Sequence, residues 1–514
     1  MNGADALIAT LVKNGVDVCF TNPGTSEMQF VTAIDKVEGM RAVLALFEGV
    51  ATGAADGYAR MAGKPASTLL HLGPGLGNGL ANLHNAKRAH SPVINIVGDH
   101  ATYHRGLDAP LTSDVEGVAK PFSHWIHTAT SADTLADDGI KAIEAASVKP
   151  GAIATLIVPA DCAWDPADGP SDRAPVLAAR DPVEDKAISA AVDALNSGEP
   201  CGFLINDLAG SEAGLALLAR IAAKTGARVI ADTFVARIAK GAGRGAYERL
   251  NYFGEGAVEQ LTGLKHLILV GTKAPVSFFA YPGKPSHLTP EGCEAMTLAP
   301  VGSDVLGALE AVAEGVGAPA EGATHQLNLP DAPTGELNAV SAWQAMAHHL
   351  PEGAILSDES TTSGLGADMY MNTARPHDLM LLTGGSIGFG LPVAVGAAIA
   401  CPDRKVVCPH GDGGAMYTIQ ALWTMAREQL DVTTVIFNNR SYAILNIELM
   451  RVGAENPGRK ALDMLDLSRP NLDFVALAQG MGVEASRAAT AEEFSDQFGS
   501  AMAGKGPRLI EVMM

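Results

Sequence analysis

An aspartate set between glycines, in the stretch HGDGG, is the most chemically suggestive feature of this sequence. Asp412 lies between the apolar run KVVCPH and a segment with apolar residues at helical spacing, so we expect it where a strand ends and a helix begins. Gly413 and Gly414 allow backbone amides to approach a ligand closely, and the positive end of a helix dipole favours an anion there. These features predict a site for a phosphate group beside Asp412.

A carboxylate beside a phosphate requires a cation between them, and the sequence offers further oxygen ligands for one. Asn439 follows the apolar run VTTVIFN, 27 positions after Asp412, and the turn behind it can offer the main-chain carbonyl of Ser441. Mg²⁺ prefers carboxylate, amide and carbonyl oxygens together with phosphate oxygens. The predicted metal ligands are therefore Asp412, Asn439 and the Ser441 backbone oxygen. The alternative is that Asp412 only caps a helix and the asparagines only form a turn.

The spacing of GDG and NN, with a strand before each, resembles the cofactor motif of thiamine diphosphate (ThDP) enzymes. The resemblance extends over essentially the whole chain, to the group that contains acetolactate synthase, pyruvate oxidase and benzoylformate decarboxylase. It implies ThDP and Mg²⁺ as cofactors, whereas no sequence feature supports FAD, which some relatives carry. It also implies a homodimer or homotetramer with each active site at a subunit interface.

Within this resemblance, Glu48 matches the catalytic acid. ThDP becomes reactive when a carboxyl group contacts N1′ of its pyrimidine ring, and Glu48 is an isolated acid between the apolar run LALF and a helical pattern. Ile387 matches the apolar residue that supports both cofactor rings, and the Gly385 carbonyl matches the acceptor for the 4′-amine. Further cofactor contacts, implied for the diphosphate, come from Gly413, Gly414, Ser360 and Thr361.

A histidine at the end of the run ASTLLH bears on the reaction. His71 matches a histidine of benzoylformate decarboxylase, and an imidazole transfers protons near neutral pH, so His71 favours decarboxylation to an aldehyde. A core histidine bonded to backbone is the alternative. The second active-site histidine of that relative is replaced here by Ala280, and the RFDDR segment of anabolic acetolactate synthases is absent. Neither relative is therefore matched in full.

Several side chains are candidates for contact with the substrate. Thr25 lies in the turn after the first strand, where similar decarboxylases place a small hydroxyl residue. Ile444 follows the metal motif and implies an apolar acyl group. The loop GDHATYHRG contains His100, His104 and Arg105, and for these three a substrate contact and a solvated position are equally consistent with the sequence. For Glu448, a place in the active site and a place on the surface are both open.

The predicted reaction is ThDP- and Mg²⁺-dependent decarboxylation of a 2-oxo acid. The remaining acyl fragment then either takes a proton and leaves as an aldehyde, or is joined to a second carbonyl compound by carboligation. Overall resemblance in the N-terminal part favours an acetolactate synthase-like protein, and a dedicated benzoylformate-type decarboxylase without synthase activity is the alternative. A remote alternative is a dinucleotide-dependent oxidoreductase, because GPGLGNG followed by Asp99 imitates a dinucleotide-binding loop.

The elements that must position these residues alternate between short apolar runs and longer helical patterns, which is typical of an α/β fold. We expect three doubly wound parallel-sheet domains. In the terms of the resemblance they are a pyrimidine-binding domain at residues 1–164, a central domain at 183–313 and a diphosphate-binding domain at 337–514. Residues 165–182 and 314–336 are rich in Pro, Ala, Asp and Gly without periodicity, and are expected to be linkers.

Composition excludes several other classes of protein. A net charge of −21 over 514 residues argues against nucleic acid or an anionic membrane as a partner. Six cysteines without a CxxC motif, and no visible export signal, favour reduced thiols and a cytoplasmic location. The 24 residues from Leu379 to Pro402 carry no charge, but their glycines and Pro392 favour a buried helix over a membrane span.

Overall fold

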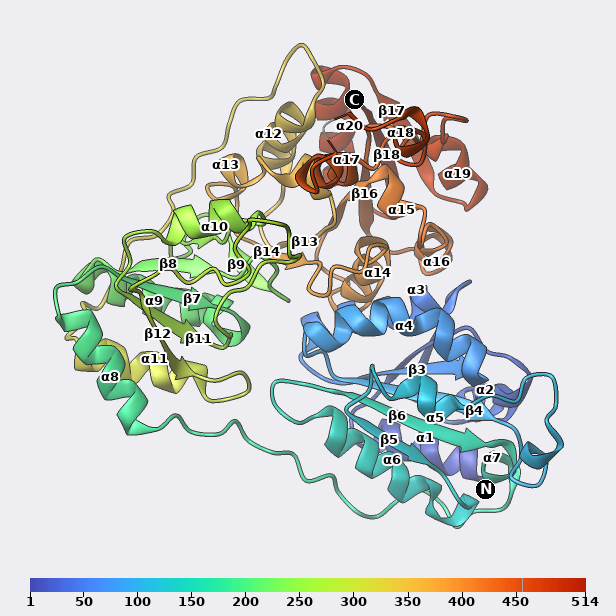
Figure 1. Ribbon diagram of the computed structural model, residues 1–514. Coiled ribbons are helices and arrows are strands. Elements are labelled where there is room, and N and C mark those ends of the chain that lie inside the picture. Colours follow the sequence, from blue (N-terminus) through green and yellow to red (C-terminus); the bar gives the residue numbers. More distant parts are fainter. Residues whose placement is uncertain (455) are drawn as a thin grey trace.

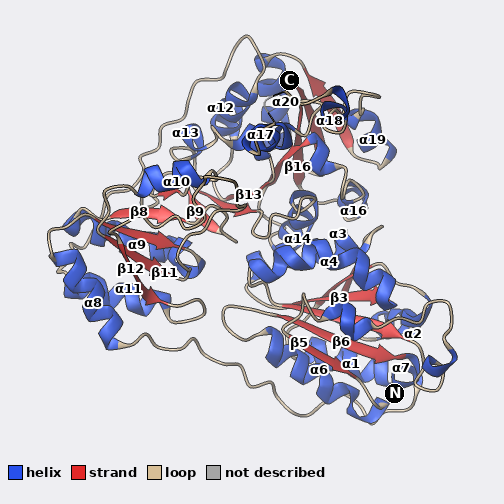
Figure 2. Cartoon of the chain, viewed as in Figure 1, coloured by secondary structure: helices blue, strands red, loops and turns tan. Residues whose placement is uncertain are grey.

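Three separate sheets organise the chain (Figure 1). The computed structural model describes residues 1–454 and 456–514. Figure 2 shows that helices surround each sheet, and nearly all strand pairs are parallel. Strands of parallel sheets are buried on both faces, which explains why most read as short continuous apolar runs. The predicted α/β fold is confirmed.

The first sheet has six strands in the order β2-β1-β3-β4-β6-β5. Two hydrophobic clusters cover its two faces. Its strands are β1 (Val18–Thr21), β2 (Arg41–Leu44), β3 (Ala66–His71), β4 (Val93–Asp99), β5 (Trp125–Thr128) and β6 (Ile153–Pro159). Its helices are α1 (Gly3–Lys13), α2 (Met28–Lys36), α3 (Glu48–Ala62), α4 (Leu72–Arg88), α5 (Val115–Ala119), α6 (Ala132–Ala146) and α7 (Ala160–Trp164).

The second sheet has five parallel strands in the order β10-β8-β7-β11-β12. A long thread with no helix or strand of its own, residues 165–184, connects it to α7 (Figure 1). Its strands are β7 (Cys201–Ile205), β8 (Arg228–Ala231), β10 (Glu248–Arg249), β11 (His266–Val270) and β12 (Glu294–Ala299). Its helices are α8 (Asp185–Asn196), α9 (Glu212–Thr225), α10 (Gly254–Leu261) and α11 (Val305–Gly315).

The third sheet has seven strands in the order β17-β18-β16-β15-β13-β14-β9. Its strands are β13 (Ala354–Asp358), β14 (His377–Leu381), β15 (Val406–Gly411), β16 (Val432–Asn438), β17 (Glu484–Ala488), β18 (Arg508–Met513) and β9 (Ile238–Lys240). Its longer helices are α12 (Ala339–His349), α14 (Gly390–Ala400), α16 (Ala421–Arg427), α17 (Ala443–Arg451), α19 (Phe474–Gly480) and α20 (Ala491–Ala503). Short helices are α13 (Asp368–Met371), α15 (Asp412–Ala415) and α18 (Arg459–Asp463).

Strand β9 departs from the sequence expectation. It lies in the segment assigned to the central domain, yet it pairs antiparallel with β14 and forms the edge of the third sheet. A strand of three residues carries too little pattern to reveal its partner, because its pairing depends on how the second and third sheets pack.

Helices α3 and α14 join the first and third sheets through one shared hydrophobic cluster. They touch at glycines: a Cβ at Gly57 would lie 2.2 Å from the Val393 carbonyl oxygen, and one at Gly396 would lie 1.9 Å from that of Ala54. Every residue of α14 except Ala400 is buried, so the uncharged stretch does contain the expected buried helix. None of the helices in the described residues combines the length and apolar character that crossing a membrane requires.

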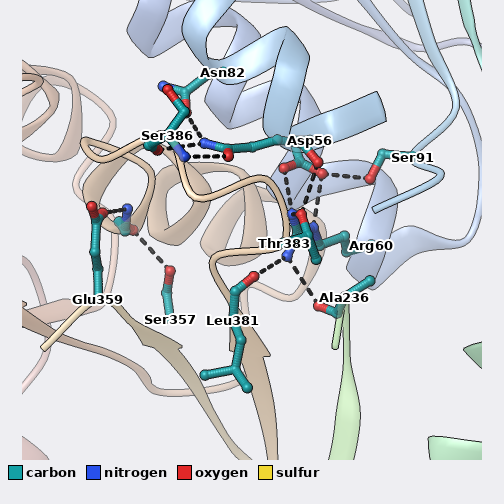
Figure 3. A network of polar contacts seen from close by, with 12 residues as sticks. Asp56, Arg60, Asn82, Ser91, Ala236, Ser357, Glu359, Leu381, Thr383 and Ser386 are labelled. Carbon is teal, nitrogen blue, oxygen red and sulfur yellow. Dashed lines mark hydrogen bonds and ion pairs between the residues drawn. The ribbon is translucent and has the colours of Figure 1, made fainter. Parts of the chain in front are cut away.

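Arg60 of α3 ties all three parts of the chain together (Figure 3). Its guanidinium makes a bidentate ion pair with Asp56, at 2.8 and 2.7 Å, and both side chains are buried. Its Nη1 also donates to the Leu381 carbonyl at the end of β14 and to the Ala236 carbonyl just before β9. One planar group with fixed donors thus sets three backbones relative to one another.

The helix expected after HGDGG is interrupted, which corrects the sequence prediction. Helix α15 ends at Ala415, and α16 begins only at Ala421. Between them, the Thr418 hydroxyl donates to the Gly388 carbonyl at 2.9 Å. Because this contact draws the chain toward the loop before α14, the backbone leaves the helical path.

Candidate active site

Glu48 begins α3 directly after the apolar run and is 7% exposed. Its Oε2 accepts a hydrogen bond of 3.0 Å from the Asn78 side chain. The other oxygen faces Gly75, where a Cβ would lie 3.2 Å from Oε1. The helix start favours a negative charge at this position, so the structure holds an acid in a defined orientation among small residues of α4.

His71 is held by a second acid, Glu27, which the sequence reading did not single out. The Nδ1 atom of His71 lies 2.8 Å from Glu27 Oε2. The same oxygen also accepts a hydrogen bond of 2.8 Å from the Gly24 N–H. Glu27 is fully buried, and burial raises its pKa although His71 opposes that effect. The histidine therefore has one ring nitrogen fixed and Nε2 available. The sequence signal for Glu27 is its place in TNPGTSE, the segment that follows β1. Strand β1 pairs with β3, which ends at His71.

The predicted metal ligands come together at the ends of the neighbouring strands β15 and β16. Asp412 is 2% exposed; Oδ1 accepts from the Gly413 N–H at 2.8 Å and Oδ2 from the Arg440 N–H at 2.6 Å. Arg440 has a φ of +56°, which turns the chain sharply after Asn439. The Asn439 side-chain oxygen then accepts from the Ser441 N–H at 2.9 Å.

Of the two asparagines of the NN pair, only the second lies in this turn. Asn438 is still part of β16, and its side chain donates to the buried Glu511 at 2.6 Å. Its role is thus to join two central strands. The alternation of side chains along a strand decides which asparagine reaches the site.

The residues around Asp412 fit a divalent cation. Burial raises the pKa of this carboxyl group, an effect that the N–H donors of Gly413, Arg440 and Ser441 oppose. Among the described residues no lysine, arginine or histidine side chain pairs with it. A buried carboxylate without a counter-charge is costly, and carboxylate, amide and carbonyl oxygens form a suitable donor set for Mg²⁺.

The motif glycines are also required by packing. A Cβ at Gly413 would lie 2.4 Å from the Tyr442 ring, and one at Gly414 would lie 3.0 Å from the His410 ring. Side chains at either position would therefore displace aromatic neighbours as well as any anion. Close packing against the aromatic rings and space for an anion thus both favour glycine at positions 413 and 414.

Gly385 and Ile387 lie in the loop between β14 and α14, at the base of the contact with α4. Gly385 is exposed with a φ of +73°, and Ile387 is partly buried. Two asparagines of α4 hold this loop: Asn82 donates to the Gly388 carbonyl at 3.2 Å and Asn85 to that of Ser386 at 2.7 Å (Figure 3). The backbone groups that carry the predicted cofactor contacts are thus fixed from outside the third sheet.

Ser360 and Thr361 follow β13 but differ in orientation. The Ser360 hydroxyl donates to Asp358 Oδ1 at 2.5 Å and is buried. Thr361 is exposed and has a φ of +51°, which is uncommon for a β-branched residue. Thr361 is therefore the residue of this pair whose hydroxyl is open to a ligand.

The loop after β4 lies beside His71, because His71 pairs with Gly98 across β3 and β4. Arg105 makes an ion pair with Asp99 at 2.5 Å, and the rings of His100 and His104 lie 5.3 Å apart. The Arg105 charge is thus partly neutralised by Asp99. The glycines of GPGLGNG lie in the first turns of α4 rather than in a loop, which does not favour a dinucleotide site.

Helix α17 carries Ile444 directly behind the Ser441 turn and contains no buried residue. Leu445 is exposed, and so is Thr25, which begins a short 3-10 helix after β1. The Glu448 carboxylate accepts from the Tyr281 hydroxyl and pairs with Arg451 at 3.2 Å. Glu448 therefore fastens the segment with Ala280 to α17.

An aromatic cluster accompanies that segment. The Phe278 ring lies 5.2 Å from the rings of Phe234 and Tyr252, and it is 41% exposed. A Cβ at Gly385 would lie 3.7 Å from it. Gly385 is thus bordered by aromatic side chains from the segment of the chain that contains the second sheet.

Comparison with known proteins agrees with this arrangement. The family description "thiamine pyrophosphate enzyme, N-terminal TPP binding domain" matches residues 1–129, and the corresponding C-terminal domain matches residues 361–512. Thiamine pyrophosphate is another name for ThDP. The chain is 55% identical, over its whole length and 99% of the relative, to a Mycobacterium tuberculosis protein provisionally named acetolactate synthase large subunit IlvX.

Decarboxylases are similar too. Benzoylformate decarboxylase of Pseudomonas aeruginosa is 32% identical over 98% of this chain and 97% of its own length. The solved structure of a Rhodococcus jostii ThDP-dependent 4-hydroxybenzoylformate decarboxylase superimposes with a TM-score of 0.86 at 26% identity, covering 100% of this chain and 99% of that one.

Proposed function

Because the chain belongs to the thiamine pyrophosphate enzyme family, we propose that it uses ThDP and Mg²⁺ to decarboxylate a 2-oxo acid. The product is an aldehyde or, by carboligation to a second carbonyl compound, an acetolactate synthase-like product. The buried carboxylate of Asp412, with no side-chain cation beside it in the described residues, is the observation that carries this proposal.

In this proposal each part of the site has one task. Asp412, Asn439 and the Ser441 carbonyl hold Mg²⁺, while the amides of Gly413 and Gly414 and the open hydroxyl of Thr361 contact the diphosphate. Ser360, whose hydroxyl donates to Asp358, supports the turn that presents Thr361. Ile387 supports the cofactor rings, the Gly385 carbonyl accepts from the 4′-amine, and Glu48 contacts the pyrimidine. Bound ThDP supplies an electron sink for the pair of electrons left when carbon dioxide departs.

The substrate side is assigned to residues of the first sheet and of α17. His71, held through Nδ1 by Glu27, delivers from Nε2 the proton that replaces carbon dioxide. Thr25, His104 and Arg105 face the substrate carboxylate, and Ile444 contacts the acyl group. The exposed apolar residues of α17 and the ring of Phe278 support an apolar acyl group. The six free cysteines support a reducing compartment such as the cytoplasm.

A panel of 2-oxo acids with added ThDP and Mg²⁺ tests this function, with carbon dioxide and products identified by mass spectrometry. Aldehydes alone would favour a dedicated decarboxylase, and ligation products would favour a synthase-like enzyme. No carbon dioxide from any 2-oxo acid would contradict the proposal.

The cofactor site is tested independently by Asp412→Ala. We expect this variant to lose the ThDP- and Mg²⁺-dependent rise in unfolding temperature, because the cation loses its charged ligand. Asp473→Ala is the matched control: it removes the cap of α19, which costs about 1 kcal/mol, but it should keep the cofactor response. An unchanged response in Asp412→Ala would count against the assignment.

A further inference from the structure

Glu359 is a buried carboxylate to which none of the roles above applies. It follows β13, and its side chain is completely buried. Oε1 accepts from the Gly388 N–H at 2.7 Å and Oε2 from the Gly390 N–H at 2.6 Å. These two donors flank the buried Phe389 and come directly after Ile387. Glu359 therefore holds the loop that carries the predicted support for the cofactor rings.

His410 connects the same carboxylate to the Asp412 turn. Its ring is completely buried, with Nε2 3.0 Å from Glu359 Oε2, close enough for an ion pair but without hydrogen-bond geometry. On its other side, Nδ1 donates to the Gly411 carbonyl at 3.0 Å, and Gly411 directly precedes Asp412. A backbone hydrogen bond also joins the two segments: the Gly411 N–H donates to the Glu359 carbonyl at 3.1 Å.

The imidazole also fills the space between the two loops. A Cβ at Gly390 would lie 2.8 Å from His410 Cδ2, and one at Gly414 would lie 3.0 Å from Cε1. Within the described residues Glu359 has no lysine or arginine partner. Because a buried carboxylate is costly without charged or polar partners, Glu359 relies on the N–H groups of Gly388 and Gly390 and on the adjacent His410 imidazole.

We propose that Glu359 and His410 are positioning residues, which fix the Ile387 loop and the Gly411–Asp412 turn in one relative arrangement before the cofactor binds. The inference rests on the proposed function, in which Ile387 contacts the rings and Asp412 the metal end of one cofactor. A pre-formed site gains affinity because less order has to be created on binding. Both side chains are completely buried, so we expect them to act through the cofactor and not through contact with the 2-oxo acid.

The test compares Glu359→Gln and His410→Gln with the wild type. For each protein, ThDP is titrated in excess Mg²⁺ while the unfolding temperature is followed, and kcat and KM for the best 2-oxo acid are measured at saturating ThDP. We expect the half-maximal ThDP concentration to rise about 10-fold or more. We expect kcat to fall as well, while KM for the 2-oxo acid stays within about twofold, because a displaced Ile387 loop misplaces the cofactor rings and leaves the substrate contacts intact.

Asp431→Asn is the matched control. Asp431 is a partly buried acid paired with Lys405; it directly precedes β16, at the N-terminal end of the strand, whereas Asp412 follows the C-terminal end of β15. Its loss should lower stability without changing the ThDP requirement. His410→Gln keeps the Glu359 carboxylate, so the test holds even where Glu359→Gln does not fold. Wild-type ThDP affinity in both variants would overturn the inference alone, whereas a wild type that ignores ThDP would overturn the proposed function with it.

Discussion

At the scale of single residues, the contact between Glu27 and His71 bears most directly on the proposed reaction. A histidine on a strand end can point either ring nitrogen into a site, and Glu27 removes that choice by binding Nδ1. The fixed tautomer and orientation leave Nε2 for proton transfer. Glu27 Oε1 has no hydrogen-bond partner within the described residues, so the contacts of this carboxylate are made by Oε2, with His71 Nδ1 and the Gly24 N–H.

This pair predicts a change in product ratio. His71→Ala should depress aldehyde formation about 100-fold, and carboligation much less, because only the aldehyde requires the proton that His71 delivers. Glu27→Gln should shift the ratio in the same direction but less. Gas chromatography of both products from one reaction checks this, with the ratio as its own control for misfolding. Equal losses of both products would indicate a structural histidine.

His377 predicts a pH dependence of stability. It begins β14 and is 3% exposed, and burial lowers its pKa from 6.5 to about 4, even though the Arg375 carbonyl accepts from its Nδ1. Between pH 6.5 and 4 the unfolded chain binds a proton that the folded chain refuses. Stability is therefore lost as pH falls through this window, by about 3 kcal/mol at pH 4.

Replacing His377 by Gln should remove this contribution. Unfolding free energies from urea denaturation, measured at several pH values between 4 and 6.5, should fall less steeply for His377→Gln than for the wild type. The carboxylates titrate equally in both proteins, so the difference isolates one histidine. Parallel curves would show that His377 keeps an ordinary pKa.

At the scale of elements, the contact of α3 with α14 fixes the first and third sheets relative to each other within one chain. Glu48 begins one helix, and the loop with Ile387 leads into the other. Glycines at their crossing let the two backbones approach more closely than side chains would allow. The α4 asparagines then bond across this contact, with Asn82 donating to both Gly49 and Gly388 carbonyls.

Gly396→Ala tests this crossing. The added methyl would lie 1.9 Å from the Ala54 carbonyl oxygen, so the helices must separate, and we expect a loss of about 1–3 kcal/mol. Gly480→Ala, at the end of α19 with no atom near the new methyl, should change stability by less than about 1 kcal/mol. Urea denaturation of both variants provides the measurement. Similar stabilities would show that the crossing tolerates wider spacing.

At the scale of the whole molecule, the proposed active site is shared between subunits of a homodimer or homotetramer. Glu48 of one subunit and Asp412 of another would then act on one cofactor, so Glu48→Gln and Asp412→Ala can complement each other. A mixed assembly regains intact sites because each subunit supplies what the other lacks.

The experiment co-expresses the two inactive variants with different affinity tags. Each mixed dimer has one intact site and one site that carries both substitutions, so doubly purified protein should regain carbon dioxide release at about half of the wild-type sites, while each variant alone stays inactive. Sedimentation velocity establishes the size of the assembly. Activity that never returns in the mixed protein would place both groups of one site in a single chain.

The sequence by itself determined the family, the α/β fold and the kind of cofactor. These follow from short-range pattern: a strand end, two glycines and an acid are local features, and metal and phosphate chemistry restricts which residue types can occupy them. The buried character of α14 was also readable, because a charge-free stretch rich in glycine must pack against other backbone.

The tertiary structure decided which groups meet across long distances in the chain. The bond of Glu27 to His71, the addition of β9 to the third sheet, the guanidinium of Arg60 between three backbones and the Glu359–His410 pair all join residues that are separated in sequence. Local pattern shows that a strand end carries a polar side chain. Only the lateral order of strands and the packing of helices decide which partner lies beside it.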